Sequence, residues 1–287
     1  MQKAFKMNKQ QQSISGQVPR SGIPPLASAT FCAAIATPPN EAFDWRICIG
    51  MRGFLGRCLD DVSESLRKKL LPVFHEHHNQ PAPFRIVLEQ SNPSEGIHRL
   101  RLVTFGSQSE WIAACFADLW RGTSGYIRSG DADIPFQTLQ IEEPEYGALY
   151  LPSARNPQEA EDSTGWELLS ASPFFSRTNA EVLFTRGRWT NLLAIRFADL
   201  MGYRRDQLQE SLPAIVAPSQ SESAIYGLAL GGRRRAQRGH IYRALFSPAA
   251  GADTLACLEL LQCLGLGRHC AYGAGAFSLQ KIADHVF

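Results

Sequence analysis

Lysine is scarce in this sequence of 287 residues, because only six of its 29 Lys and Arg residues are lysine. The others are arginines, whose planar guanidinium groups match phosphate oxygens and stack on nucleobases. A GC-rich genome produces the same bias, so composition alone does not decide between these two explanations. With 27 Asp and Glu residues the net charge is only +2, which argues against a broadly sticky basic protein. If the ligand is a nucleic acid, this balance favours recognition of one defined structure.

Cysteine pairs and long apolar runs are also missing. The seven cysteines form no C-x-x-C motif and are odd in number, which disfavours a structural zinc site and a disulfide framework. No stretch of about 18 apolar residues occurs, and residues 1–25 are polar rather than similar to a secretory signal. We therefore expect a flexible N-terminal tail, no membrane span, no metal or other cofactor, and a cytoplasmic protein with reduced thiols.

The hydrophobic pattern of residues 26–150 predicts one ferredoxin-like domain. Its order is strand, helix, two strands, helix and strand, or β-α-β-β-α-β. The expected elements are a strand at 29–37, a helix from 47 to about 72, strands at 84–89 and 97–105, a helix from 109 to Gly122, and a strand at 136–141.

The same order of elements recurs after a polar, acidic and proline-containing segment, 151–165, which we interpret as a linker. Residues 166–287 then predict a second domain. Its expected elements are strands at 166–171, 224–230, 241–246 and 272–279, and helices at 189–201 and 253–263. The predicted fold is therefore α+β, with tandem ferredoxin-like (RRM-like) domains.

The most specific motif is LGLGRHCAYGAGAFSL, residues 264–279, with glycine pairs at Gly265, Gly267 and Gly273, Gly275. A helix is expected before it and a strand after it, the reverse of a dinucleotide-binding loop, so a nucleotide-dependent enzyme is disfavoured. Such glycines can bring backbone N–H groups close to phosphates, beside the side chains of Arg268 and His269. Alternatively, they only permit tight packing between helix and strand.

A nearby stretch supports the phosphate interpretation. Residues 223–252 contain no acidic side chain, while five arginines gather around the Gly231-Gly232 bend. An arginine-rich hairpin is often only a solvated tip, but beside a glycine loop it favours a track for RNA phosphates. The predicted RNA-binding residues are Arg233, Arg234, Arg235, Arg238, Gly265, Gly267, Arg268, His269, Gly273 and Gly275.

The segment GLGRHCAYGAGAF resembles the glycine-rich loop of the CRISPR repeat-processing endoribonucleases of the RAMP superfamily. Leu100–Trp120 and Gly50–Leu59 match other segments of that family more weakly, in the expected order. The resemblance implies tandem ferredoxin-like domains that bind a CRISPR repeat hairpin and cleave precursor CRISPR RNA without a metal. The 2′-hydroxyl attacks the adjacent phosphate, leaving a cyclic phosphate and a 5′-hydroxyl. It also implies that the product stays bound in an effector complex with other Cas subunits.

The catalytic residues are harder to assign. Many members of that family use a histidine near the first helix, but here no histidine precedes His75. The His75, His77 and His78 run lies where this helix should end, which fits a cap better than a catalytic or metal site. The candidates are His240 and an arginine-based site that includes Arg52, Arg57 and Arg243. This pattern resembles the type IV processing subunit. A non-catalytic RAMP subunit that only binds RNA is the alternative.

Overall fold

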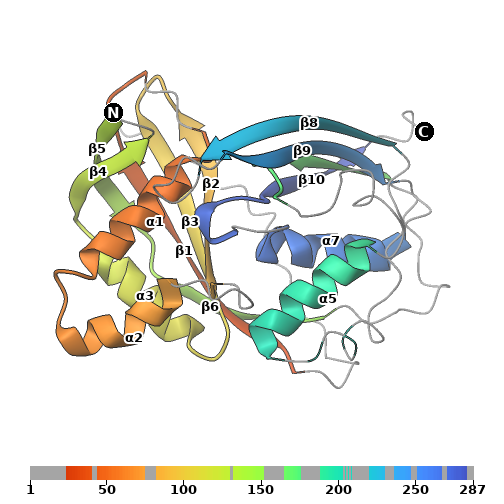
Figure 1. The fold of residues 1–287 in the computed structure, drawn as a ribbon, viewed down its shortest axis with the longest axis horizontal. Helices are drawn as coiled ribbons and strands as arrows, with labels where there is room; N and C mark the ends of the chain where they lie inside the picture. Colours follow the sequence, from red (N-terminus) through yellow and green to blue (C-terminus); the bar gives the residue numbers. More distant parts are fainter. Residues whose placement is uncertain are drawn as a thin grey trace.

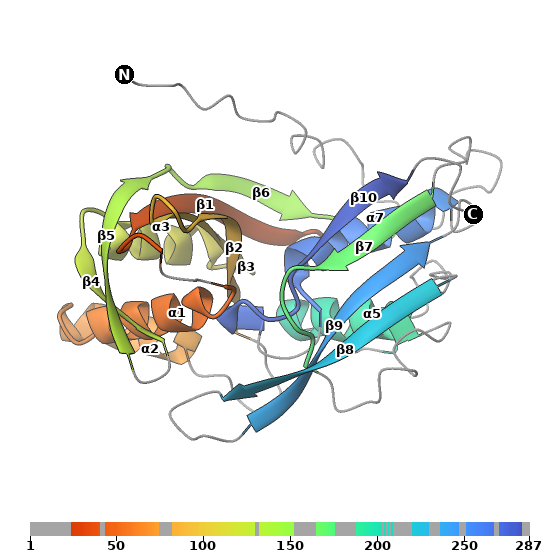
Figure 2. The ribbon, with the colours of Figure 1, turned by 90° about the horizontal axis from the view of Figure 1, so that it is seen from above.

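The computed structural model describes two halves, each a sheet with helices packed on one face (Figures 1 and 2). The described residues are 24–40, 44–74, 82–129, 132–151, 165–175, 188–202, 204, 206, 208, 220–229, 236–246, 251–266 and 270–282. Within these residues no helix is long and apolar enough to cross a membrane.

The described residues of the first half form six strands and three helices. These are β1 (Leu26–Ala36), α1 (Ile47–Cys58), α2 (Glu64–Phe74), β2 (Phe84–Asn92), β3 (Ile97–Phe105), α3 (Ser109–Trp120), β4 (Ser124–Ser129), β5 (Ala132–Ile141) and β6 (Glu145–Leu149). The strand order is β2-β3-β1-β5-β4, and β6 also pairs with β1. Strands β4 and β6 are additions to the predicted β-α-β-β-α-β order.

The second half contains β7 (Gly165–Ser170), α5 (Arg188–Met201), β8 (Gln220–Ala229), β9 (Ala236–Phe246), α7 (Gly251–Leu264), a one-turn 3₁₀ helix η4 (Cys270–Tyr272) and β10 (Phe277–Ile282). Its strand order, β10-β7-β9-β8, is the order that the corresponding strands β5, β1, β3 and β2 have in the first half. All described strand pairs are antiparallel. The predicted α+β fold with tandem ferredoxin-like halves is confirmed.

Two expected elements differ from the structure. The helix expected from 47 to about 72 is two helices, because Asp60, Asp61 and Ser63 favour turns and caps over helix interiors, and the Ser63 hydroxyl accepts a hydrogen bond from the Leu66 N–H at the start of α2. The strand expected at 272–279 begins only at Phe277, since Gly273 and Gly275 have positive φ angles of 83° and 66° that a strand does not accommodate.

The two halves share an apolar interface. Leu26, Val103 and Phe105 lie on the sheet face opposite α1 and α3, and they belong to the same buried cluster as residues of α5 and α7. The other face of this sheet, with Phe31, Ile86 and Leu102 among others, packs against α1 and α3 in a separate core. The second half therefore docks on an apolar part of the first sheet. The boundary predicted at 151–165 lies mostly outside the described residues and stays a prediction.

Candidate functional site

Arg52 and Arg57 project from α1 and each reaches a backbone carbonyl of a neighbouring element. The Nη2 of Arg52 donates a hydrogen bond to the carbonyl of Phe74, the last residue of α2. Its guanidinium also lies over the rings of Phe74 and Phe84, at 5.7 and 6.0 Å from their centroids. Arg57 is exposed and donates from Nη2 to the Tyr126 carbonyl of β4, at 2.7 Å. Arg52 therefore joins α1 to the end of α2, and Arg57 joins it to β4.

Arg243 lies on β9 in the second half. Its Nε forms an ion pair with Oε1 of Glu167 on β7, and the two side chains are 56% and 13% exposed. Its cross-strand neighbours are Leu169 on β7 and Glu222 on β8. Arg243, the predicted site residue of β9 whose side chain is described, is thus held by a carboxylate.

The structure tests the other predicted site residues only in part. His240 and Arg238 lie on β9 opposite Ile225 and Gly227 of β8, and their side chains are outside the described residues. Arg233, Arg234, Arg235, Gly267, Arg268 and His269 lie outside the described residues altogether. The bonds described above tie Arg52 to α2, Arg57 to β4 and Arg243 to β7. Their grouping with His240 in one catalytic site stays a prediction.

The glycine-rich segment, residues 265–276, connects α7 to β10. Gly265 ends α7 with a φ of 82°, and its N–H donates to the Leu261 carbonyl at 2.7 Å. The Leu266 N–H donates to the Gly275 carbonyl at 3.0 Å, which closes the loop, and the Gly275 N–H donates to the carbonyl of Pro173 at 3.0 Å. Both ends of the segment are therefore fixed by backbone hydrogen bonds.

Three glycines of this segment are buried and leave no room for a side chain. A Cβ on Gly273 would lie 2.6 Å from Cβ of Cys48 on α1 and 3.2 Å from the Ile86 carbonyl oxygen of β2. A Cβ on Gly265 would lie 3.1 Å from Nε of Arg85, and one on Gly275 would overlap the Leu266 backbone. For these glycines the geometry fits the tight-packing alternative, and direct contact with RNA stays a prediction.

The same segment lies at the joint between the two halves. Ala271 belongs to the apolar core of the first half. Ala274 packs in a small cluster with Trp45, which precedes α1, and with Phe175. The ring centroids of Trp45 and Phe175 are 6.3 Å apart. The segment therefore connects the second sheet to the first core and to the start of α1.

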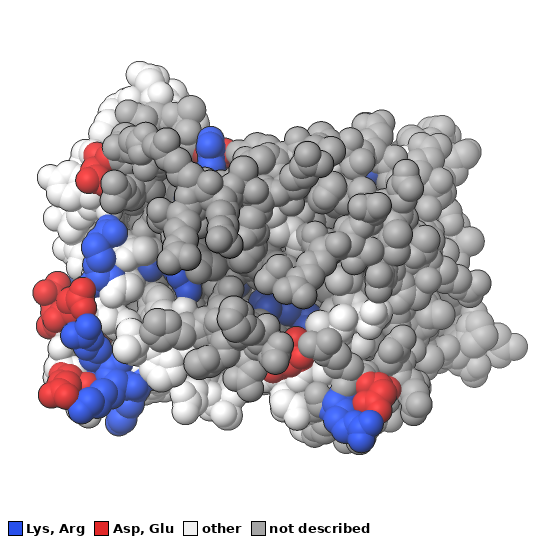
Figure 3. Space-filling view, in the orientation of Figure 1, with Lys and Arg blue, Asp and Glu red and all other residues white. Residues whose placement is uncertain are grey.

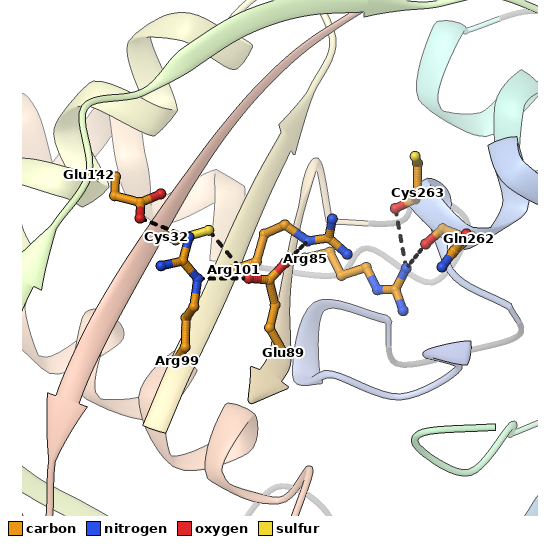
Figure 4. A network of polar contacts seen from close by, with 8 residues as sticks. All are labelled: Cys32, Arg85, Glu89, Arg99, Arg101, Glu142, Gln262 and Cys263. Carbon is orange, nitrogen blue, oxygen red and sulfur yellow. Dashed lines mark hydrogen bonds and ion pairs between the residues drawn. The ribbon is translucent and has the colours of Figure 1, made fainter. Parts of the chain in front are cut away.

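Arg85 on β2 is a residue of this joint that sequence reasoning missed. It is 1% exposed, and its Nη1 donates to the carbonyls of Gln262 at 2.7 Å and Cys263 at 3.2 Å, at the end of α7 (Figure 4). Burial lowers the pKa of this guanidinium to about 10. The sequence does contain an indication of this residue: Arg85 is a single charge inside the apolar strand Phe84–Leu88, and a buried charge requires a partner.

A charge network continues along the same sheet face (Figure 4). Arg99 bridges Glu89 at 3.1 Å and Glu142 at 2.8 Å, and Arg101 pairs with Glu89 at 3.1 Å. The Cys32 thiol donates to Glu89 at 3.5 Å, and burial together with the Glu89 charge raises its pKa to about 12. Two arginines are thus balanced by two carboxylates, so this network is already paired without an anion from outside.

Charges of both signs also alternate around α2, at the lower left of Figure 3. Lys68 pairs with Glu64 at 2.6 Å, and Arg67 pairs with Asp60 at 3.1 Å. This part of the surface has no excess of positive charge and is a poor match to an RNA backbone. Among the described residues, no group of three or more His, Cys, Asp or Glu side chains is arranged to hold a metal ion.

Together, two ferredoxin-like halves fixed to one another through a glycine-rich segment define a tandem ferredoxin-like protein. No protein-family sequence profile and no curated protein sequence matches the chain. Solved structures of Cas6 do. A Cas6 product complex is 15% identical over 89% of this chain and 99% of its own, with a TM-score of 0.51. A Cas6-RT-Cas1–Cas2 complex, solved in part, is 13% identical over 92% of this chain and 47% of its own, with a TM-score of 0.53.

The particular fold is therefore that of Cas6. A second Cas6 product complex supports this, at 15% identity over 88% of this chain and 99% of its own, with a TM-score of 0.50. The resemblance seen in the glycine-rich motif is confirmed at the level of the fold.

Proposed function

We propose that this chain is a metal-independent endoribonuclease that binds a CRISPR repeat hairpin and cleaves precursor CRISPR RNA to guides. The observation that carries the proposal is the glycine-rich segment at the joint of two ferredoxin-like sheets, in a fold that matches Cas6 over nearly the whole of both chains. Those Cas6 structures are product complexes, which favours RNA processing. Retention of the cleaved RNA in a complex with other Cas subunits belongs to the same proposal.

In the proposed reaction the 2′-oxygen attacks the neighbouring phosphorus while the bond from phosphorus to the 5′-oxygen breaks. The 2′-hydroxyl loses its proton, and the departing 5′-oxygen gains one, giving a 2′,3′-cyclic phosphate and a 5′-hydroxyl. Negative charge develops on the phosphate oxygens, so guanidinium groups stabilise the transition state. Arg57 suits this role best among the α1 pair, because it is exposed, whereas Arg52 packs on two aromatic rings. Arg243 and His240 complete the proposed site, with His240 as the group that moves a proton.

For RNA binding we propose the arginines of the β8–β9 connection with Arg268 and His269. Binding by guanidinium groups to phosphates is sensitive to salt, because each contact releases counterions. We therefore expect affinity for the repeat hairpin to fall steeply between about 50 and 200 mM salt.

A second candidate function is RNA binding without cleavage, as a structural RAMP subunit. One observation favours it: the guanidiniums of Arg52 and Arg243 are engaged by the Phe74 carbonyl and by Glu167. If these bonds persist when RNA is bound, two of the four proposed catalytic residues hold the protein together and do not contact the scissile phosphate.

The experiment that separates the two functions is a cleavage assay with a repeat hairpin RNA in excess chelator. We expect cutting in chelator and none when the scissile nucleotide carries a 2′-deoxy sugar. Arg57→Ala, His240→Ala and Arg243→Ala should slow single-turnover cleavage with little change in affinity. The control is Arg121→Ala, because Arg121 is an arginine outside the proposed site whose side chain is 52% exposed and paired with Glu143.

Each alternative outcome has a definite meaning. Cleavage that stops in chelator, or that continues on the deoxy substrate, would show that the proposed mechanism is wrong. Tight binding without cleavage of any repeat would establish the non-catalytic subunit. Loss of affinity equal to loss of rate in the Arg57→Ala variant would remove that residue from catalysis and assign it to binding.

A further inference from the structure

The C-terminal end of α7 has all four of its terminal carbonyls bonded. In a helix these groups have no partner within the helix and need one from elsewhere. The Leu261 carbonyl accepts from the Gly265 N–H, and the Leu264 carbonyl accepts from Nε of Arg196 on α5 at 3.3 Å. The carbonyls between them, of Gln262 and Cys263, both accept from Arg85. Half of this helix end is therefore completed by the other half of the chain.

Two consecutive residues of β2 hold the two ends of the glycine-rich segment. The Arg85 guanidinium lies against Gly265 at its start, and the Ile86 carbonyl lies against Gly273 near its end. Positions 267–269, three of the six in this segment that are predicted to bind RNA, fall between Gly265 and Gly273 in the sequence. Contacts with β2 therefore flank these three positions on both sides in the sequence.

Burying the Arg85 guanidinium between β2 and α7 costs more free energy than burying an apolar side chain that would fill the same space. Its side chain is almost fully buried, and its Nε has no hydrogen-bond partner among the described residues. A buried charge requires partners to offset its lost hydration, and well-packed apolar residues often replace buried charges without loss of stability. Its cross-strand neighbour on the same sheet face, Val103, is apolar and packs in the shared core. A role other than packing explains why a charged residue is buried at position 85 while its neighbour at position 103 is apolar.

We propose that Arg85 is a positioning residue for RNA binding: by holding the end of α7 and Gly265, it fixes the start of the glycine-rich segment, to which the proposed RNA contacts Arg268 and His269 belong. This inference rests on the proposed function for its RNA part. Its structural part, ordering of residues 265–276, is independent of RNA. Arg196 does not duplicate this role, since it bonds α7 from α5 within the same half.

The test compares Arg85→Met with Val103→Ala in the full chain. Methionine keeps much of the volume and removes the donors. Val103→Ala loosens the adjacent position in the apolar core that is shared with α7, but it removes no hydrogen bond to the end of that helix. We measure amide hydrogen exchange of peptides covering 265–276, affinity for the repeat hairpin, and urea unfolding. Arg85→Met should raise exchange in the segment and weaken RNA affinity by about tenfold or more, the scale of a lost charge-assisted hydrogen bond. Val103→Ala should reduce stability without either effect.

Two further variants test whether Arg85 acts through the segment. Arg85→Lys, which retains charge and donors, should recover part of the affinity. In a chain that carries Arg268→Ala and His269→Ala, adding Arg85→Met should cause little further loss of affinity, because the contacts that it positions are gone. If Arg85→Met fails to fold, Arg85→Gln, with one amide donor, serves in the same comparisons.

Several results would overturn the proposal. Unchanged exchange in 265–276 would remove the structural part. Equal losses of affinity in Arg85→Met and Val103→Ala would show an unspecific effect of destabilisation, as would full additivity with the Arg268 and His269 changes. If the unmodified chain binds no repeat RNA, the proposed function and the RNA part both fail, and the exchange data alone decide whether Arg85 orders the segment.

Discussion

Gly275→Ala perturbs the joint at the point where the chain is most crowded. Gly275 has a φ of 66°, in the left-handed region, and its carbonyl accepts the Leu266 N–H at 3.0 Å. An added Cβ would overlap the Leu266 carbonyl oxygen and lie 2.7 and 2.8 Å from its carbonyl carbon and nitrogen. These are backbone atoms, so no side-chain rotation can relieve the contact. The loop between α7 and β10 must open.

A second glycine with the same φ angle separates the two contributions to the loss of stability, backbone strain and steric overlap. Gly122 has the same φ of 66° and nothing within 4 Å of an added Cβ. Gly122→Ala should therefore cost only the left-handed strain, about 1–2 kcal/mol. Gly275→Ala adds overpacking of about 1–3 kcal/mol and a lost backbone hydrogen bond of about 1 kcal/mol. The expected excess for Gly275→Ala is thus about 2–4 kcal/mol.

Thermal and urea unfolding, followed by circular dichroism, measure this difference. For a chain of this size each kcal/mol lowers the Tm by about 2–4 °C, so the Tm of Gly275→Ala should lie about 5 to 15 °C below that of Gly122→Ala. Equal Tm values for the two variants would refute the packing argument. They would mean that the segment has room at Gly275 and is not clamped between Leu266 and Pro173.

Three further predictions concern individual side chains. His98 is fully buried between Thr37 and Ser91, and burial lowers its pKa. Stability should therefore fall as pH drops below about 6.5, where the unfolded chain binds a proton that the folded chain does not. A His98→Gln variant should lose this part of the pH dependence in urea titrations, and an unchanged profile would contradict the prediction. Burial raises the pKa of the Cys48 thiol to about 12, so iodoacetamide at pH 8 should leave it unmodified in the native protein and label it in urea. Glu167→Gln removes the ion pair to Arg243 and should speed single-turnover cleavage of the repeat hairpin several-fold; an unchanged rate would indicate that Arg243 does not act on the scissile phosphate.

The order of elements could be predicted from the sequence because hydrophobic periodicity reports which face of each element is buried. The strands at 84–89 and 97–105 and the helices at 109 and 189 follow this rule closely. Strands β4 and β6 escaped it. Their exposed Tyr126 and Tyr146 belong to short strands whose pairing partners, rather than their own pattern, define them. The turn between α1 and α2 escaped because apolar residues continue at helical spacing across it.

The glycine-rich motif could be found from the sequence, but the way it is held could not. Its spacing shows where the chain needs positive φ angles, since only glycine accepts them readily. That Gly265 rests on Arg85 and Gly273 on Cys48 depends on how two domains dock, and no local pattern encodes docking. Likewise, Arg52 and Arg243 could be selected as cations, but their carbonyl and carboxylate partners come from distant parts of the chain.

The cap on α7 also has a consequence for the order in which the protein is made. Arg85 precedes Gln262, whose carbonyl it binds, by 177 residues. At synthesis rates of about 5–20 residues per second, β2 leaves the ribosome roughly 10 to 35 seconds before the end of that helix. The first half can thus fold first and serve as a template on which the last helix and the glycine-rich segment are completed. A circularly permuted gene that begins with the second half would reverse this order and synthesise α7 before its cap exists.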